Sequence, residues 1–169
     1  KDGWFEIVDG TVTAIGASRP VGSPDPSGVD LGERVIMPGV VNAHSHLELS
    51  GLHGRIPRAT SMPSWARAVM DERPNLASSL AGRVPYAASE CRRCGTALVG
   101  DIANTLDSLD TLRTECIDAT LFHEFLGFDI EAADADNLVE PVSRQIAEQL
   151  NDRVQIRAAA HAPYSVSAE

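Results

Sequence analysis

The sequence predicts an α/β fold built on parallel strands, and two observations carry this prediction. Short apolar runs alternate with stretches of helical pattern along most of the 169-residue chain. Such alternation is typical of parallel strands joined by covering helices. In addition, His44, Asp101, Glu124 and His161 each fall at or just past the end of a predicted strand. In an open parallel sheet and in a barrel alike, these strand ends carry the chemistry.

The N-terminal segment predicts a β-hairpin. Apolar runs at 4–8 and 11–16 flank an Asp-Gly pair at positions 9 and 10. Asp-Gly between two such runs is the strongest short hairpin signal. Residues 17–33 are rich in Pro, Gly and Ser and predict a loop. The apolar run that follows is broken by Pro38 and Gly39, so the buried strand is expected over 40–44.

The rest of the chain predicts alternating helices and strands. Helices are expected over 61–72, 76–94, 106–116 and 137–150, and strands at 96–103, within 118–128 and at the start of 154–167. Ser61 or Ser64 can cap the first helix, whose apolar face would contain Trp65, Val69 and Met70, and Ser108 can cap the third. Pro85 is expected to interrupt or kink the second helix, whereas Pro141 can occupy the first turn of the last.

Composition narrows the partners and the location. The formal net charge of −10 disfavours a nucleic-acid or anionic-membrane partner, because both require a basic face. No apolar run reaches the roughly 18 residues of a membrane helix, and the N-terminus has no signal-peptide pattern. Three cysteines without framework spacing fit a reducing compartment. We therefore expect a cytoplasmic protein with a small-molecule substrate, and its full-length form could pair as a homodimer.

Cys91 and Cys94 form a C-x-x-C motif, which is compatible with a redox or zinc role and with a structural one. Residues at this spacing share a helix face, and Gly95 directly after them predicts a helix end. The sequence has no second cysteine pair to complete a zinc site. We interpret the motif as the end of a helix.

The segment PGVVNAHSHLELSG at 38–51 contains the most informative pair, His44 and His46. Because side chains alternate along a strand, the two imidazoles should point the same way. They could then bind one ion at the roughly 2.0–2.1 Å typical of zinc–nitrogen bonds. An H-x-H pattern also occurs by chance in loops, but the preceding apolar strand and the position at its carboxyl end favour a metal site.

The longer segment MPGVVNAHSHLELS resembles the first-strand signature of the amidohydrolase superfamily, in its cytosine-deaminase-like branch of chlorohydrolases and nucleoside deaminases. Three later segments are similar to those enzymes in the same order: ECRRCGTALVGDI, FHEFLGF and HAPYSVS. The resemblance covers essentially the whole chain. It implies that 38–169 form about four βα units, the N-terminal half of a (β/α)8 TIM barrel, and that 1–37 belong to a small β-sandwich and its linker.

The resemblance makes His44 and His46 ligands of one divalent metal, with zinc the first choice and iron the second. Asp101 would accept a hydrogen bond from a ligand histidine and fix its tautomer, although it could equally cap a turn. Glu48 could hold the loop that follows the first barrel strand. His53 is expected to be a structural or surface residue, and so is His123.

Substrate contacts are implied for three residues. His161 would orient the substrate without binding metal, although it could instead pin Tyr164 and the turn that follows. Glu124 would line the pocket, or be a solvated or salt-bridged carboxylate at a strand end. Trp65 is most simply a core residue of its helix, although it could also form a stacking wall for an aromatic substrate.

The resemblance also implies residues that this chain does not supply. They are a third histidine ligand with a glutamate acid/base, a further histidine and a late aspartate, all expected beyond Glu169. We therefore interpret the chain as the N-terminal part of an enzyme, with no catalytic acid/base within it.

The implied reaction is attack of metal-activated water on a ring carbon that carries an amine, with release of ammonia. The substrate would be an aminopurine nucleoside or a related aminated heterocycle, and HLELS is similar to aminofutalosine-deaminase-like members. Two alternatives stay open. One is hydrolysis of an amide, guanidine or ring halide on the same scaffold, and the other is a non-catalytic binding module.

Overall fold

The computed structural model describes residues 3–17, 28–58, 60–115, 117–127, 130–149 and 153–166. The chain divides into two compact units, Lys1–Met37 and Pro38–Glu169. Most of the loop predicted over 17–33 lies outside the described residues. Within the described ranges, no helix is long and apolar enough to cross a membrane.

The first unit contains an antiparallel hairpin of β1 (Trp4–Val8) and β2 (Thr11–Gly16). Its two turn residues have positive φ angles, 49° at Asp9 and 76° at Gly10. A two-residue hairpin turn of the type that matches strand twist needs positive φ at both positions, and Asp-Gly provides it at low cost. The predicted hairpin is confirmed.

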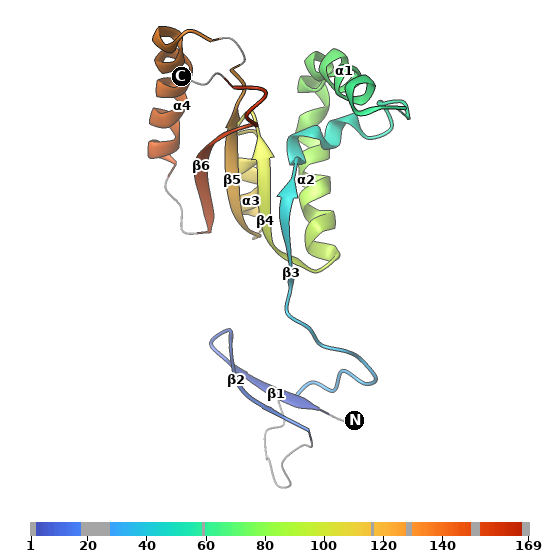
Figure 1. Ribbon diagram of the computed structural model, residues 1–169. Coiled ribbons are helices and arrows are strands. Elements are labelled where there is room, and N and C mark those ends of the chain that lie inside the picture. Colours follow the sequence, from blue (N-terminus) through green and yellow to red (C-terminus); the bar gives the residue numbers. More distant parts are fainter. Residues whose placement is uncertain are drawn as a thin grey trace. The chain divides into compact units, whose positions relative to one another are not determined.

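The second unit is built on a parallel sheet of four strands in the order β3-β4-β5-β6. All four arrows in Figure 1 run in one direction, so the carboxyl ends of the strands lie together at one end of the sheet. Their bounds are Val40–Ser45 for β3, Thr96–Ala103 for β4, Asp118–Phe125 for β5 and Val154–Ala160 for β6. The predicted α/β fold with parallel strands is confirmed, and it is consistent with part of an amidohydrolase barrel.

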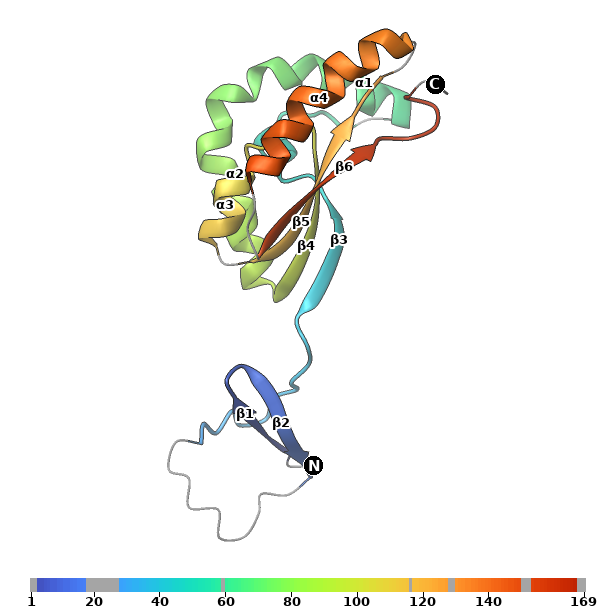
Figure 2. The same cartoon turned by 90° about the vertical axis from the view of Figure 1, so that its left-hand side faces the viewer.

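Helices cover one face of this sheet, as Figure 2 shows for α2, α3 and α4. The core between them contains Val84, Val99, Leu112 and Leu121, none more than 1% exposed. Burial of such side chains is the main force that holds the helices on the sheet. The helices are α1 (Met62–Glu72), α2 (Ala77–Arg93), α3 (Leu109–Thr114) and α4 (Ala132–Glu148), with short 3-10 helices η1 (Leu47–Leu52) and η2 (Arg73–Asn75).

Pro85 does not interrupt its helix, and Pro141 does not lie in the first turn of its helix as predicted. Helix α2 runs without interruption through Pro85. Pro141 lies well inside α4, because that helix begins at Ala132 after the extended residue Glu131. Each proline removes one backbone N–H from its helix, so neighbouring bonds and packing must hold these helices together.

Helix α1 begins as the sequence predicts but presents a different face. Ser61 is the N-cap, and its hydroxyl accepts a bond from the Ser64 N–H in a capping box. Val69 is buried, whereas Met70 is 60% exposed and Trp65 is 39% exposed. Neighbouring helical residues point about 100° apart, and in α1 Val69 faces the core while Met70 points to solvent. The predictions of Met70 in the buried face and of Trp65 as a core residue are wrong.

Candidate functional site

The two histidines of the H-x-H motif face each other at the carboxyl end of β3. His44 lies within the strand, and His46 is the residue that precedes η1. Their Nε2 atoms are 3.2 Å apart, and the rings meet edge to face. Two nitrogens bound to one tetrahedral ion at about 2.05 Å would lie about 3.3 Å apart. The separation of the two nitrogens in this exposed pair is therefore compatible with a shared divalent ion.

Among the described residues, no third possible metal ligand lies beside these two nitrogens. The described part of the chain contains no cluster of three or more His, Cys, Asp or Glu side chains that could hold a metal ion. Catalytic zinc is normally held by three protein ligands and one water. The pair alone would therefore supply only part of the ligand set of a catalytic zinc.

Asp101 supports the segment that follows the histidine pair. It is fully buried inside β4, where Oδ1 accepts from the Leu47 N–H at 2.8 Å and Oδ2 from the Ser108 hydroxyl at 2.6 Å. Burial raises the pKa of this carboxyl, and the two bonds oppose that rise. Ser108 lies at the N-cap position of α3, but its hydroxyl donates to Asp101 and does not cap the helix. The hydrogen bonds described for Asp101 therefore hold Leu47, the residue after His46. This agrees with the alternative in which Asp101 caps a turn.

Glu48 anchors the same segment from its other side, as the sequence suggests. The residue is 4% exposed, and its carboxylate binds one cation and two loop residues. Oε1 accepts from Arg73 Nη2 at 2.6 Å and from the Asn104 N–H at 3.2 Å. Oε2 accepts from the N–H and the hydroxyl of Thr105 at 3.2 and 3.1 Å. A buried carboxylate is costly unless it is paired and hydrogen-bonded, and this one is both.

Glu124 lies at the carboxyl end of β5 and is half-buried. It alternates with the buried His123, so its side chain points to the face of the sheet away from the core. Its backbone carbonyl accepts a bond from Asn104 Nδ2 at 2.7 Å, which ties the end of β5 to the loop after β4. This placement is suited to lining a pocket at the strand ends.

His161 directly follows β6 and has an exposed side chain. The backbone N–H of His161 donates to the Phe125 carbonyl at 3.1 Å, which fixes the end of β6 beside the end of β5. Nδ1 is 2.6 Å from the Ser165 hydroxyl, and the ring meets Tyr164 edge to face. The turn contacts that the sequence suggests for His161 are present.

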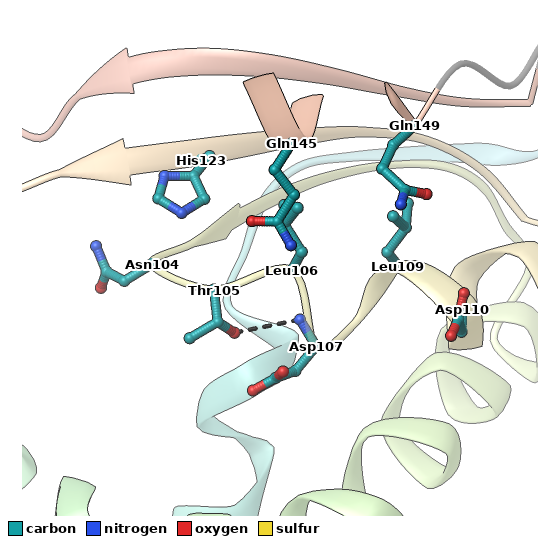
Figure 3. A pocket seen from close by; sticks show the side chains of 9 residues that line it. All are labelled: Asn104, Thr105, Leu106, Asp107, Leu109, Asp110, His123, Gln145 and Gln149. Carbon is teal, nitrogen blue, oxygen red and sulfur yellow. Dashed lines mark hydrogen bonds between the residues drawn. The ribbon is translucent and has the colours of Figure 1, made fainter. Parts of the chain in front are cut away.

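A separate polar cavity of about 450 Å³ lies on the helix side of the sheet. Figure 3 shows its lining, which comes from the loop after β4 and from α3, β5 and α4: Asn104, Thr105, Leu106, Asp107, Leu109, Asp110, His123, Gln145 and Gln149. The predicted metal and substrate residues are not in this lining. The cavity shares Asn104 and Thr105 with the contacts of Glu48.

The two other histidines differ in their surroundings. His123 is 7% exposed and packs its ring against Phe125, while burial lowers its pKa. Its Nδ1 is buried and has no hydrogen-bond partner among the residues described. His53 is exposed and follows η1. Both positions agree with the expected structural or surface roles.

The C-x-x-C motif ends α2, as predicted. Cys91 and Cys94 are free, and Gly95 takes a φ of 86°, which suits glycine after a helix. Burial, together with neighbouring Cys94, raises the pKa of the Cys91 thiol. A raised pKa disfavours the reactive thiolate, which agrees with a structural role.

Arg73 and Asn104 are the site residues that sequence reasoning missed. Asn104 directly follows β4, so the strand-end rule that selected Asp101 could have found it. Arg73 lies after α1, 25 residues from Glu48, and no local pattern marks it.

Two curated proteins are related to this chain over part of their length. Adenosine deaminase from Helicobacter pylori is 28% identical over 134 residues, which cover 78% of this chain and 32% of that protein. A 5-methylthioadenosine/S-adenosylhomocysteine deaminase from Nitratidesulfovibrio vulgaris is 28% identical over 180 residues, which cover 100% of this chain and 40% of that protein. The chain spans well under half the length of both. No protein-family model matches it.

Solved structures share the fold. Aminofutalosine deaminase from Helicobacter pylori, in complex with methylthio-coformycin, matches with a TM-score of 0.69 and 25% identity over 77% of this chain and 31% of that one. Guanine deaminase from C. acetobutylicum with bound guanine matches with a TM-score of 0.71 and 16% identity over 99% of this chain and 43% of that one. Relatives and structural neighbours are amidohydrolase-type deaminases, which confirms the resemblance inferred from the sequence.

Proposed function

We propose that the whole protein is a metal-dependent hydrolase that deaminates an aminopurine nucleoside or a related aminated heterocycle. The observation that carries this proposal is the 3.2 Å approach of the His44 and His46 Nε2 atoms at the end of β3. Its support is the pair of related deaminases, whose names specify adenosine and 5-methylthioadenosine or S-adenosylhomocysteine.

The roles of the chain's own residues follow from their positions. His44 and His46 would hold zinc, or iron as the second choice, and the bound metal would supply an activated water. An atrazine chlorohydrolase from Arthrobacter aurescens, solved with zinc and atraton, shares the fold with a TM-score of 0.54 and 17% identity over 77% of this chain and 36% of that one.

The substrate would lie across the strand ends, beside His161 and Glu124, with Trp65 as a candidate stacking wall. His161 would donate or accept one hydrogen bond through Nε2, according to its tautomer. The proposal places the acid/base glutamate, a third histidine ligand and a late aspartate beyond Glu169.

We also propose a more specific fold for each of the two units. The four parallel strands would be the first half of a (β/α)8 barrel. The hairpin would join a small β-sandwich, because Ile7, Val12 and Ile15 are each more than half exposed on two strands that lack a covering layer among the described residues. A lone hairpin is marginally stable in water, so further strands would be needed to bury these side chains. We also propose a cytoplasmic location and a small-molecule substrate.

Ammonia release from defined substrates tests the function. The zinc-loaded whole protein should release ammonia from at least one of adenosine, 5-methylthioadenosine, S-adenosylhomocysteine or guanine. Chelation should abolish turnover, and added zinc should restore it. Chloride release from a chlorinated triazine without any deamination would favour the halide-releasing alternative, and loaded protein inert toward every substrate would favour a binding module.

A further inference from the structure

A partly buried ion pair joins the start of η1, directly after the His44–His46 pair, to the end of α1. Arg73 Nη2 donates to Glu48 Oε1 and to Asn104 Oδ1, both at 2.6 Å. The Glu48 side chain is 6% exposed and that of Arg73 is 28% exposed. Glu48 is the second residue after His46, and Asn104 in turn holds the carbonyl of Glu124 at 2.7 Å. One guanidinium nitrogen thus links η1, η2 and the exits of β4 and β5.

Building on the function proposed above, we propose that Arg73 is a positioning residue that acts through Glu48 to hold the His44–His46 pair in its metal-binding geometry. The start of η1, directly after His46, is fixed at two points. Asp101 holds the Leu47 N–H, and Glu48 holds the loop after β4. Without the second point, His46 could turn away from His44, and the 3.2 Å approach would be lost.

The contact differs from the surface ion pairs of the same chain in its burial. Arg144 and Glu140 also lie 2.6 Å apart, but their side chains are 71% and 62% exposed. Solvent screens such a pair and can replace it, so it contributes little to structure. Removal of Arg73 would instead leave a buried carboxylate without its cation, and the carboxylate would have to move toward solvent. Arg144 is therefore a matched control for Arg73.

The geometry also predicts which substitutions should retain the positioning role of Arg73 and which should remove it. Both bonds come from a single nitrogen, so one ammonium could replace the guanidinium, and Arg73→Lys should retain the coupling. Arg73→Gln removes the charge. Glu48→Gln places an amide nitrogen, which cannot accept a bond, opposite the N–H of either Asn104 or Thr105.

Cobalt(II) titration of the whole protein tests the proposal with a signal that a purely structural residue would not move. The variants are Arg73→Gln, Arg73→Lys, Glu48→Gln and the control Arg144→Gln, each checked for retained secondary structure by circular dichroism. Arg73→Gln and Glu48→Gln should weaken Co²⁺ binding about ten- to a hundredfold and shift the visible ligand-field bands, as losses of ligand support typically do. Arg73→Lys and Arg144→Gln should bind Co²⁺ like the wild type.

Substrate kinetics add a second, independent measurement. At saturating metal, Arg73→Gln should lower kcat more than it raises KM, because the displaced group is a metal ligand. Unchanged Co²⁺ affinity and spectrum in folded Arg73→Gln and Glu48→Gln would overturn the proposal, as would Arg73→Lys binding as weakly as Arg73→Gln. The metal titration does not depend on turnover. A wild-type protein that binds Co²⁺ but releases no ammonia would therefore contradict the proposed function and leave the positioning role to be judged by the titration.

Discussion

At the residue scale, metal binding should depend on both imidazoles of the pair. Each ring supplies one of two nitrogens 3.2 Å apart, so removal of either would leave a single imidazole at the carboxyl end of β3. We expect the whole protein to bind one metal per chain and His44→Ala or His46→Ala to lower that content severely. Elemental analysis of purified protein measures it, with exposed His53→Ala as the control. Full occupancy in both variants would contradict the assignment.

His161 should affect catalysis without affecting metal content. Loss of one substrate hydrogen bond costs about 1–3 kcal/mol of transition-state stabilisation, so His161→Asn should lower kcat/KM roughly ten- to a hundredfold. Steady-state kinetics and elemental analysis of the same preparation check both parts. Loss of metal would make His161 a ligand, and unchanged kinetics would leave it the role of binding Ser165 in the turn.

His123 predicts a pH dependence of stability. Burial lowers its folded-state pKa below the ordinary value of 6.5, so the unfolded chain binds more protons between those two pKa values. The free energy of unfolding should therefore fall as the pH is lowered below about 6.5 and level off below the folded-state pKa. Asp101 acts with the opposite sign, since its raised pKa makes stability fall as pH rises above its ordinary value of 3.8.

Comparison with a His123→Leu variant isolates the contribution of the histidine. Chemical denaturation between pH 5 and pH 7.5 should show a smaller loss of stability on acidification in the variant than in the wild type. Equal pH dependence in both proteins would show that His123 does not titrate differently in the folded and unfolded states.

At the element scale, local patterns predicted the strands and helices because each pattern acts within a few residues. The Asp9-Gly10 turn, the Ser61 cap and the Gly95 helix end all follow from the conformational preferences of the residues themselves. The position of Pro141 did not follow, because its effect on α4 depends on where the helix begins nine residues earlier. Local preference alone does not decide between a proline at a helix start and one inside it.

The supporting contacts of the site could be predicted only in part. The H-x-H pattern places His44 and His46 together because alternate residues of an extended segment share a face. The bond from Leu47 to Asp101 and that from Arg73 to Glu48 cross 54 and 25 residues, so they depend on the packing of whole elements. The sequence suggests that Glu48 holds the loop after the first barrel strand, but it does not predict that Arg73 is its partner.

The close approach of β3 and β4 yields a prediction about Gly100. A Cβ at this position would lie 2.5 Å from the Ala43 carbonyl oxygen, one residue before His44. Gly100→Ala should force the strands apart, destabilise the protein by about 1–3 kcal/mol and weaken metal binding. Thermal unfolding and metal titration measure the two effects. Gly3→Ala, whose Cβ would meet its nearest atom at 3.6 Å, is the control, and equal behaviour of the two variants would contradict the predicted clash.

At the scale of the whole molecule, the sheet has two open edges. β3 and β6 each pair with one neighbour in the described sheet, and β3 exposes Val40 and Val41 at 48% and 59%. Unpaired strand edges with apolar side chains tend to associate with other chains. The 169 residues expressed alone should therefore form concentration-dependent aggregates in light scattering. A soluble monomer with a sharp, reversible unfolding transition would show that these edges need no further cover.

The same 169 residues should bind metal weakly and should not turn over substrate. The two imidazoles at the end of β3 are the proposed ligands, and no cluster of three or more possible ligands exists among the described residues. Loss of a direct ligand should weaken affinity by more than the roughly hundredfold upper range for loss of a supporting contact. Zn²⁺ titration of the chain and of the whole protein measures the difference, and ammonia assays compare their activities. His44→Ala in the chain should abolish even the weak binding, which separates the paired site from nonspecific sites. Turnover by the 169 residues alone would show that the acid/base group lies within them, and the assignment of that group to residues beyond Glu169 would then be wrong.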